Sequence, residues 1–354
     1  MHIRRLTFEI LVERESPVDS LFLPHGRPSA RIARLVLLTA AVLVASVPSL
    51  APAESAYPSR PVRVVVPFPP GQGTDLIARQ LAYHLATALG QSFFVENRPG
   101  AAGIIGTQLV KNAQADGYTL LVAGGGPLAI NASFYSKLPY DPVKDFQPIA
   151  MIAAVPNVLV VRSDFPANNL QELVAYVRKN DGKLNYASSG NGVPNHLIME
   201  LFKSAASLHI THVPYQGSGA AITGVMAGQV AMMFDTAAAV LPQVRSGRFK
   251  VIATAGAKRA LALPDVPTIA EQGYPGFAAQ GWSALVAPAG TPPDVIRRLN
   301  VEATAILRKP EVRAELITLG TDPMQFGADE TAAYIKSEVA HWAQAVKISG
   351  AHAD

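Results

Sequence analysis

Short apolar runs rich in β-branched residues alternate with longer segments of helical periodicity from about residue 57 onward. This alternation is typical of βαβ units, and it predicts an α/β fold with mainly parallel sheets flanked by helices. Several of the runs are continuously apolar, as expected for strands that are buried on both faces. The predicted strands span residues 62–68, 93–97, 119–123, 149–162, 184–187, 210–214, 230–235, 250–255 and 283–287.

Four helices follow from periodicity and from the residues at their ends. Leucines recur on one side of residues 75–89, and a glycine follows them. Asn168 and Asn169 are both favourable N-caps for a helix over 170–179. A proline near the first turn opens a helix over 292–307, and the amphipathic segment 329–348 predicts a long C-terminal helix.

Two apolar stretches, 148–161 and 277–288, are candidates for passages of the chain between two domains. They predict a discontinuous first domain, made of residues 57–158 and 280–354, and an inserted second domain over 159–279. Two crossings at one hinge suit a cleft that closes on a ligand.

Residues 1–56 have the character of a leader. Two arginines precede the uncharged apolar core 35–47, and small-residue sites follow it. We therefore predict a signal peptide, cleaved after Ala53 or after Ala56. A core of this length is short for a membrane span, which needs about 20 residues. Acidic residues among the first 30 are untypical of such a leader, so we expect translation to begin nearer Val18 or Leu23.

Composition narrows the classes of function. The chain is 49% apolar and only 16% charged, which excludes intrinsic disorder. It contains no Cys, which excludes disulfides, thiolate metal sites, Cys nucleophiles and a lipoprotein anchor. A net charge of +4 without a dense basic run does not support binding to nucleic acid. We expect an exported protein without a metal or another cofactor.

Three glycine-rich loops each follow a predicted strand and lead into a helix; we call residues 67–75 the first loop, 186–196 the second and 213–219 the third. Open α/β sheets bind ligands at the carboxyl ends of their strands. Glycine amides, hydroxyls and free amides at helix N-termini suit a small carboxylate, although tight structural turns share this pattern. The candidate contacts are Gly71, Gly73, Thr74, Ser188, Ser189, Gly190, Gly192, His196, Tyr215, Gln216 and Gly217.

Some candidate residues also allow a second function. Asp235 ends a predicted strand, where it either meets a ligand amine or caps a turn. Ser188 or Ser189 with His196 predicts a secreted serine hydrolase as the alternative function. No nucleophile elbow of the G-x-S-x-G type supports this alternative.

Two further motifs carry less weight. Residues 124–129 match the G-x-G-x-x-A pattern of dinucleotide sites, but no acidic residue closes a following strand. We expect this segment to line the same cleft as the three loops. His209 and His212 are three residues apart, which places them on opposite faces of a strand and argues against a metal site.

Motifs in a fixed order run through the chain: PFPPGQGTD at 67–75, VENRPGAAG at 95–103, DGYTL at 116–120, SGNG at 189–192, VPYQG at 213–217 and LPDVPT at 263–268. With these motifs the chain resembles the substrate-binding proteins of tripartite tricarboxylate transporters, also called Bug receptors. The resemblance extends over residues 57–348.

The resemblance implies a two-domain periplasmic binding protein of the Venus-flytrap type, similar to type II, with two hinge crossings. It implies a periplasmic, non-enzymatic receptor that captures a di- or tricarboxylate, an amino acid or an aromatic acid in the cleft. The receptor would deliver this acid to the permease subunits of a tripartite transporter or to a sensor kinase, and we expect it to act as a monomer. A third possibility, the effector-binding module of a regulator, does not fit the leader.

Carried onto this chain, the resemblance adds Phe68, Pro70 and Asp75 to the ligand contacts of the first loop. Asp75 is also expected to brace the loop from within. Gln72 stands where a glycine is usual, which adds a bulky amide near the anion site. Val193 and Pro194 stand where a hydroxyl residue is common, so one hydrogen bond to the ligand is expected to be missing.

Overall fold

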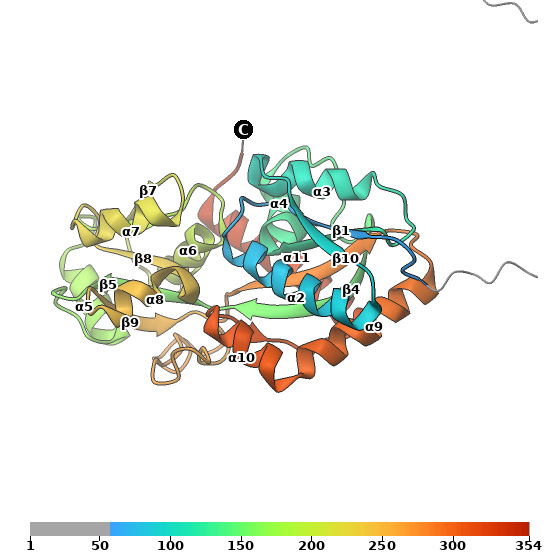
Figure 1. Cartoon of the computed structure of the whole chain (residues 1–354). Helices are drawn as coiled ribbons and strands as arrows, with labels where there is room; N and C mark the ends of the chain where they lie inside the picture. Colours follow the sequence, from blue (N-terminus) through green and yellow to red (C-terminus); the bar gives the residue numbers. More distant parts are fainter. Residues whose placement is uncertain (1–56, 354) are drawn as a thin grey trace, which may run out of the picture. The chain divides into compact units, whose positions relative to one another are not determined.

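A computed structural model describes residues 57–353, which contain two β-sheets with helices packed against them (Figure 1). The predicted signal peptide and its cleavage sites lie outside the described residues. The first sheet has the strand order β11-β4-β10-β3-β1-β2, and the second has the order β7-β6-β8-β5-β9. We call the first sheet with its helices the first lobe, and the second sheet with its helices the second lobe.

The first lobe is built from the two ends of the described chain. Its strands are β1 (Val62–Val66), β2 (Phe93–Asn97), β3 (Thr119–Gly124), β4 (Phe146–Val155), β10 (Gly281–Pro288) and β11 (Asp322–Pro323). Its helices are α2 (Gly73–Leu89), η1 (Ala101–Gly103), α3 (Ile104–Lys111), the π-helix η2 (Gly126–Ile130), α4 (Asn131–Phe134), α9 (Pro293–Arg308), α10 (Pro310–Thr318) and α11 (Ala328–Ser349).

The second lobe comes from the middle of the chain. Its strands are β5 (Asn157–Arg162), β6 (Asn185–Ser188), β7 (Thr211–Pro214), β8 (Met232–Thr236) and β9 (Phe249–Thr254). Its helices are α5 (Leu170–Lys179), α6 (Pro194–Ala206), α7 (Ser218–Met226) and α8 (Ala237–Arg245).

The expected α/β fold with two lobes is confirmed, but the sheets are mixed rather than mainly parallel. Strand β1 pairs in parallel with β2 and β3, and β6 pairs in parallel with β7 and β8. The strands next to the passages between the lobes, β4, β5, β9 and β10, make antiparallel pairs. The prediction erred because a continuously apolar strand is buried on both faces in either kind of pairing.

The chain passes between the lobes at Pro156. The sequence predicted one strand over 149–162, but the structure divides this run into β4 and β5, which belong to different sheets. The Pro156 carbonyl accepts a hydrogen bond from the Ala237 amide at 2.8 Å. The return passage lies beside the first, because the Ala255 amide donates to the Asn157 carbonyl at 2.8 Å.

Apolar side chains alternate between the two faces of the strands, as a pleated strand requires. Along β10, Trp282 and Ala284 belong to one hydrophobic cluster, whereas Leu285 belongs to another that contains α2 and α9. In β5, Leu159 faces the cluster of Trp282, whereas Val158 faces a third cluster that contains α7 and α8.

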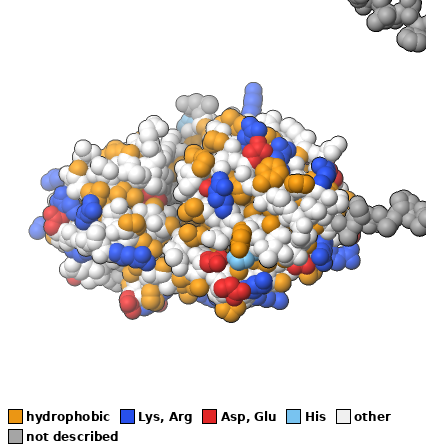
Figure 2. Space-filling model, in the orientation of Figure 1, with side chains coloured by type: hydrophobic (Ala, Val, Ile, Leu, Met, Phe, Trp, Pro, Cys, Tyr) orange, Lys and Arg blue, Asp and Glu red, His pale blue; other side chains and the backbone are white. Residues whose placement is uncertain are grey.

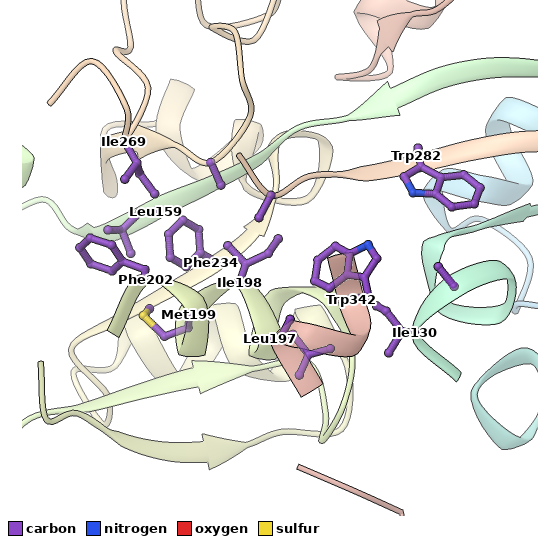
Figure 3. Packing of buried hydrophobic residues seen from close by; sticks show 14 of the residues in the cluster. Ile130, Leu159, Leu197, Ile198, Met199, Phe202, Phe234, Ile269, Trp282 and Trp342 are labelled. Carbon is purple, nitrogen blue, oxygen red and sulfur yellow. The ribbon is translucent and has the colours of Figure 1, made fainter. Parts of the chain in front are cut away.

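One of these clusters is common to both lobes. Trp282 of β10 and Trp342 of α11 belong to the same buried cluster as Leu197 and Ile198 of α6 (Figure 3). Helix α11 packs directly on α6. The two lobes therefore share one core, which we call the shared core.

Local signals placed several elements well. Helix α5 covers the predicted residues 170–179, and the side chain of Asn169 caps it by accepting a hydrogen bond from the Glu172 amide at 2.8 Å. Strand β2 also has the predicted bounds. On the surface, hydrophobic and charged side chains are interspersed over the face shown in Figure 2.

Candidate functional site

The first loop connects β1 to α2 and is braced from within by Asp75, as expected. Oδ2 of Asp75 accepts hydrogen bonds from the Gly71 amide at 2.8 Å and from Nε of Arg79 at 2.9 Å. Oδ1 accepts one from Nδ2 of Asn97 at 2.8 Å. The Asn97 amide also donates to the Phe68 carbonyl at 3.0 Å. This network fixes the loop to α2 and β2.

The Asp75 carboxyl remains charged although it is buried. Burial raises its pKa, but hydrogen bonds from Arg79, Gly71 and Asn97 together hold the pKa below its ordinary value. The ion pair with Arg79 balances this charge. The first loop therefore carries no unbalanced negative charge toward a ligand.

The N-terminus of α2 is open to a ligand. Its N-cap residue, Gln72, makes no side-chain capping bond, so the first-turn amides lack such a partner. A Cβ built on Gly71 or Gly73 would meet nothing within 4 Å. Of these two glycines, only Gly71 has a positive φ, +82°, because Gly73 already begins the helix. In Figure 1 this end of α2 points toward the second lobe.

The second loop is held in place by two histidines. Oγ of Ser188 lies 2.6 Å from Nε2 of His212 and donates to the Gly190 carbonyl at 2.7 Å. The Gly192 amide donates to Nδ1 of His196 at 3.0 Å, and the Gly190 amide donates to Oγ of Ser188 at 3.3 Å. The sequence predicted exposed amides at both glycines, but they are engaged inside the loop because acceptor side chains lie within its short span.

Both histidines are neutral at ordinary pH. Burial lowers the pKa of His196 to about 3, and the neighbouring His212 adds to this effect. Burial likewise holds the pKa of His212 below its ordinary value. The two rings stack with centroids 3.9 Å apart, and Tyr186 stacks on His212 at 4.9 Å. A neutral imidazole is what His196 needs to accept the Gly192 hydrogen bond.

The pairing that the hydrolase alternative requires is not formed. Ser188 contacts His212 instead of His196, and its side chain is fully buried. Ser189 exchanges hydrogen bonds with the side chain of Asn195 at 3.0–3.3 Å. Both hydroxyls therefore organise the loop.

The third loop is fastened to the second by backbone hydrogen bonds. The Tyr215 amide donates to the Ser188 carbonyl at 3.0 Å, and the Gly217 amide donates to the Ser189 carbonyl at 3.1 Å. The Tyr215 hydroxyl donates to Gln229 at 3.3 Å, so this side chain lies along α7. Gln216 is exposed, and α7 begins without a side-chain cap. The first-turn amides of α7 therefore lack a side-chain partner, like those of α2.

Asp235 lies at the carboxyl end of β8 and is 2% exposed. One carboxyl oxygen accepts a hydrogen bond from the Thr236 amide at 2.7 Å. The other oxygen, Oδ2, has no hydrogen-bond partner. Burial raises the pKa of this carboxyl to about 6, although the Ser218 hydroxyl and the Thr236 amide oppose the effect. The expectation of a turn cap is met in part by the bond to Thr236.

Contacts outside the three loops bring the two lobes together at the second loop. The ring of Phe134, in α4 of the first lobe, lies against Gly192; a Cβ on this glycine would be 2.2 Å from the ring. In the first lobe, the Pro67 side chain lies beside Gly103 and Gly106. Sequence reasoning missed Phe134 because nothing in its neighbourhood in the sequence resembles a binding motif.

Replacing Gly192 by alanine is expected to lower the free energy of unfolding by about 1–2 kcal/mol and to weaken ligand binding several-fold. The new methyl would strain a backbone with φ +71° and would push against Phe134. Thermal unfolding and titration calorimetry measure both effects. Gly182→Ala is the matched control, because Gly182 has φ +68° and open space around it. Equal losses in the two variants would show that the contact with Phe134 is unimportant.

Residues 124–129 are not a nucleotide loop. Gly124 ends β3, and the glycine-proline segment after it forms the buried π-helix η2, whose Pro127 carbonyl accepts a hydrogen bond from the Tyr140 hydroxyl at 2.9 Å. A surface hollow elsewhere is lined by Arg60, Arg63 and Asp116. It lies at the amino end of β1, and its arginines are already paired with acidic residues. We therefore place the candidate site at the three loops.

Two negative findings concern the described part of the chain. Within residues 57–353, no three His, Asp or Glu side chains gather closely enough to hold a metal ion. None of the helices in this range is both long and apolar enough to span a bilayer.

Known proteins are similar to this chain in fold and in sequence. Residues 77–350 match the model of the tripartite tricarboxylate transporter family receptor. The protein BugT of Bordetella pertussis is 38% identical over 83% of this chain and 91% of its own length. The R. palustris protein Rpa4515, solved with adipate, superposes with a TM-score of 0.76 at 35% identity, covering 83% of this chain and 98% of Rpa4515. MatC from Rhodopseudomonas palustris with bound malate gives 0.71 at 35% identity, covering 82% and 100%.

Proposed function

The chain belongs to the tripartite tricarboxylate transporter receptor family, and on this basis we propose that it is a periplasmic solute-binding receptor for a small carboxylate. The acid enters between the lobes, is held by the three loops, and shifts the population toward a closed form. The closed form then docks on the permease subunits of a tripartite transporter or on a sensor kinase. The receptor acts as a monomer and reaches the periplasm through the predicted signal peptide.

The observation that carries this proposal is the set of helix N-termini at the loops. Helices α2, α6 and α7 all begin at the carboxyl ends of parallel strands, and none has a side-chain cap. A helix N-terminus offers amide donors and a partial positive charge, which suit an anion. Hydrogen bonds to a carboxylate are worth roughly 1.5–3 kcal/mol each, so a few of them hold a small acid without an arginine.

The related structures with adipate and malate support a carboxylate as the ligand class. We extend this to the site residues of this chain, which are the open turn Phe68–Asp75, the second-loop residues and the start of α7. We also propose that the domains divide as the sequence predicts, with residues 159–279 inserted between 57–158 and 280–354. The passages at Pro156 and after Thr254 support this division.

Titration calorimetry of the exported protein against mono-, di- and tricarboxylates and aromatic acids tests the proposal. Trapped ligand is first removed by mild unfolding and refolding. We expect at least one acid to bind with micromolar or tighter affinity and to raise the melting temperature by several degrees. If no acid binds and none shifts the melting temperature, the proposed function is wrong.

A further inference from the structure

A buried carboxyl with an unfilled acceptor lies at the ligand loops of the second lobe. Asp235 is 2% exposed, and its Oδ2 has no hydrogen-bond partner. Strands β6 and β8 are parallel neighbours, so Asp235 lies at the same end of the sheet as Ser188. The Ser218 hydroxyl, in the first turn of α7, is close enough to act on the carboxyl. An acceptor of this kind costs free energy until a donor reaches it.

The elements around Asp235 provide no positive charge to balance it. Helix α7 and strand β6 contain no charged residue. Strand β5 carries only Arg162, which pairs with Phe249 at the far end of the sheet, whereas Val158 is the residue opposite Asp235. The only charge in α8 is Arg245 in its last turn.

The remaining titratable groups near this end of the second sheet are also unable to balance Asp235. His196 of α6 and His212 of β7 are held neutral by burial. Glu200 and Lys203 of α6 form an ion pair with each other at 2.6 Å. The contrast with the first lobe is clear, because Asp75 there is neutralised by Arg79.

Donor amides and an acceptor oxygen therefore stand next to each other. Helix α7 starts after Gly217, which has a φ of +91° and provides no side-chain cap. Its first-turn amides suit a carboxylate, whereas Oδ2 of Asp235 needs a donor. A molecule that carries a carboxylate with an ammonium or a hydroxyl on a neighbouring carbon satisfies both.

We propose that Asp235 is a specificity-determining residue, which makes the receptor select amino or hydroxy carboxylic acids over the unsubstituted acids of the same length. This inference rests on the proposed function, because it concerns the ligand of the same site. The ammonium or hydroxyl of the ligand donates the hydrogen bond that Oδ2 of Asp235 lacks. A slight movement of the third loop admits this group to the buried carboxyl.

The ionisation of Asp235 gives the selection a pH dependence. Its pKa is raised to about 6 by burial, and the ionised form is the one that accepts a ligand ammonium best. The affinity for an amino acid is therefore expected to fall as the pH falls through about 6. The affinity for the unsubstituted acid of the same length should not fall in this way.

The test compares matched ligands of two lengths by titration calorimetry at pH 7.5 and pH 5. The first set is succinate, malate and aspartate, and the second is glutarate, 2-hydroxyglutarate and glutamate. In at least one set, the wild-type receptor should bind a substituted acid at least tenfold more tightly than the plain one. In Asp235→Asn, which keeps the acceptor for Thr236, this ratio should fall to threefold or less, with the plain acid bound as before.

Asp181→Asn is the control, because it makes the same substitution in the second lobe at an exposed carboxyl that pairs with His209, outside the three loops, and it should keep the wild-type preference. Equal affinities for plain and substituted acids in the wild type would overturn this inference but not the proposed function. An unchanged preference in Asp235→Asn would do the same. Absence of binding by every acid would overturn the proposed function and this inference with it. Should Asp235→Asn fail to fold, the wild-type ratios and their pH dependence decide the matter.

Discussion

Trp342→Ala is expected to lower the free energy of unfolding by about 3–5 kcal/mol, as for other fully buried tryptophans. The side chain is 1% exposed and belongs to the shared core with Leu197 and Ile130 (Figure 3). Its Nε1 also donates to Glu338 at 2.9 Å. The cavity left behind would lie where α11 packs on α6, the helix that follows the second loop. Ligand affinity should therefore fall as well, and denaturant unfolding and calorimetry measure the two effects.

Trp342→Phe separates packing from hydrogen bonding. Phenylalanine keeps most of the apolar area but cannot donate to Glu338, which retains the second donor, Nε1 of Trp282, at 2.8 Å. We expect a loss of about 1–2 kcal/mol for this variant. A loss below 1 kcal/mol in Trp342→Ala would contradict the view that the two lobes depend on this core.

Asp75→Ala is expected to lower the free energy of unfolding by about 2–4 kcal/mol and ligand affinity at least tenfold. The substitution leaves the Gly71 amide and the Asn97 side chain without the acceptor that fixes the first loop. The helix N-terminus remains, but the turn before it is no longer held against β2. Chemical unfolding and calorimetric titration with the best acid of the panel provide the measurements.

Arg79→Gln is the control for Asp75→Ala. Arg79 is half exposed whereas Asp75 is buried, but the Gly71 and Asn97 donors to the carboxyl remain, so this variant should lose about 1–2 kcal/mol, less than Asp75→Ala. The effect of Asp75→Ala should depend on pH. The pKa of Asp75 is below its ordinary value of 3.8 in the folded protein, so its stabilisation is present above about pH 4 and is lost as the pH falls further. A constant difference between wild type and variant from pH 7 to pH 3 would contradict the ionised brace.

Elements with strong local signals could be predicted from the sequence. Helix α5 has a capping asparagine and an apolar stripe, and these fix its bounds without help from the rest of the fold. The first loop was located by its prolines and glycines, and its brace by the carboxylate that follows them. Elements of this kind depend on residues close together in the sequence.

The pairing of strands could not be predicted in the same way. The run 149–162 is apolar except for Asn157 and its last residue, Arg162, so only Pro156 and Asn157 mark the change from one sheet to the other. A proline interrupts the backbone hydrogen bonds between strands, but it does not indicate which strand pairs with β4 and which with β5. The antiparallel pairing of β4 with β10 joins segments more than a hundred residues apart.

In the candidate site, too, residues with local sequence signals could be predicted, whereas residues that act from other segments could not. Its glycines and hydroxyls were found because they follow strands, whereas Asn97, His212 and Phe134 were not chosen. Each of these three acts on a loop from another segment of the chain. His212 was set aside as a possible metal ligand, yet it orients Ser188 by a contact that only the tertiary structure creates. Sequence patterns thus located the loops, and packing determines which of their groups are free.

The shared core has a consequence for how this receptor unfolds. Leu197 and Ile198 of one lobe and Trp282 and Trp342 of the other lose their apolar surroundings if either lobe melts alone. Local melting would expose this surface to water at roughly 25 cal/mol per Å². The lobes should therefore act as a single cooperative unit, with one calorimetric transition despite two sheets. The same coupling means that a segment cut out at the two passages would keep its helices but carry an uncovered apolar face.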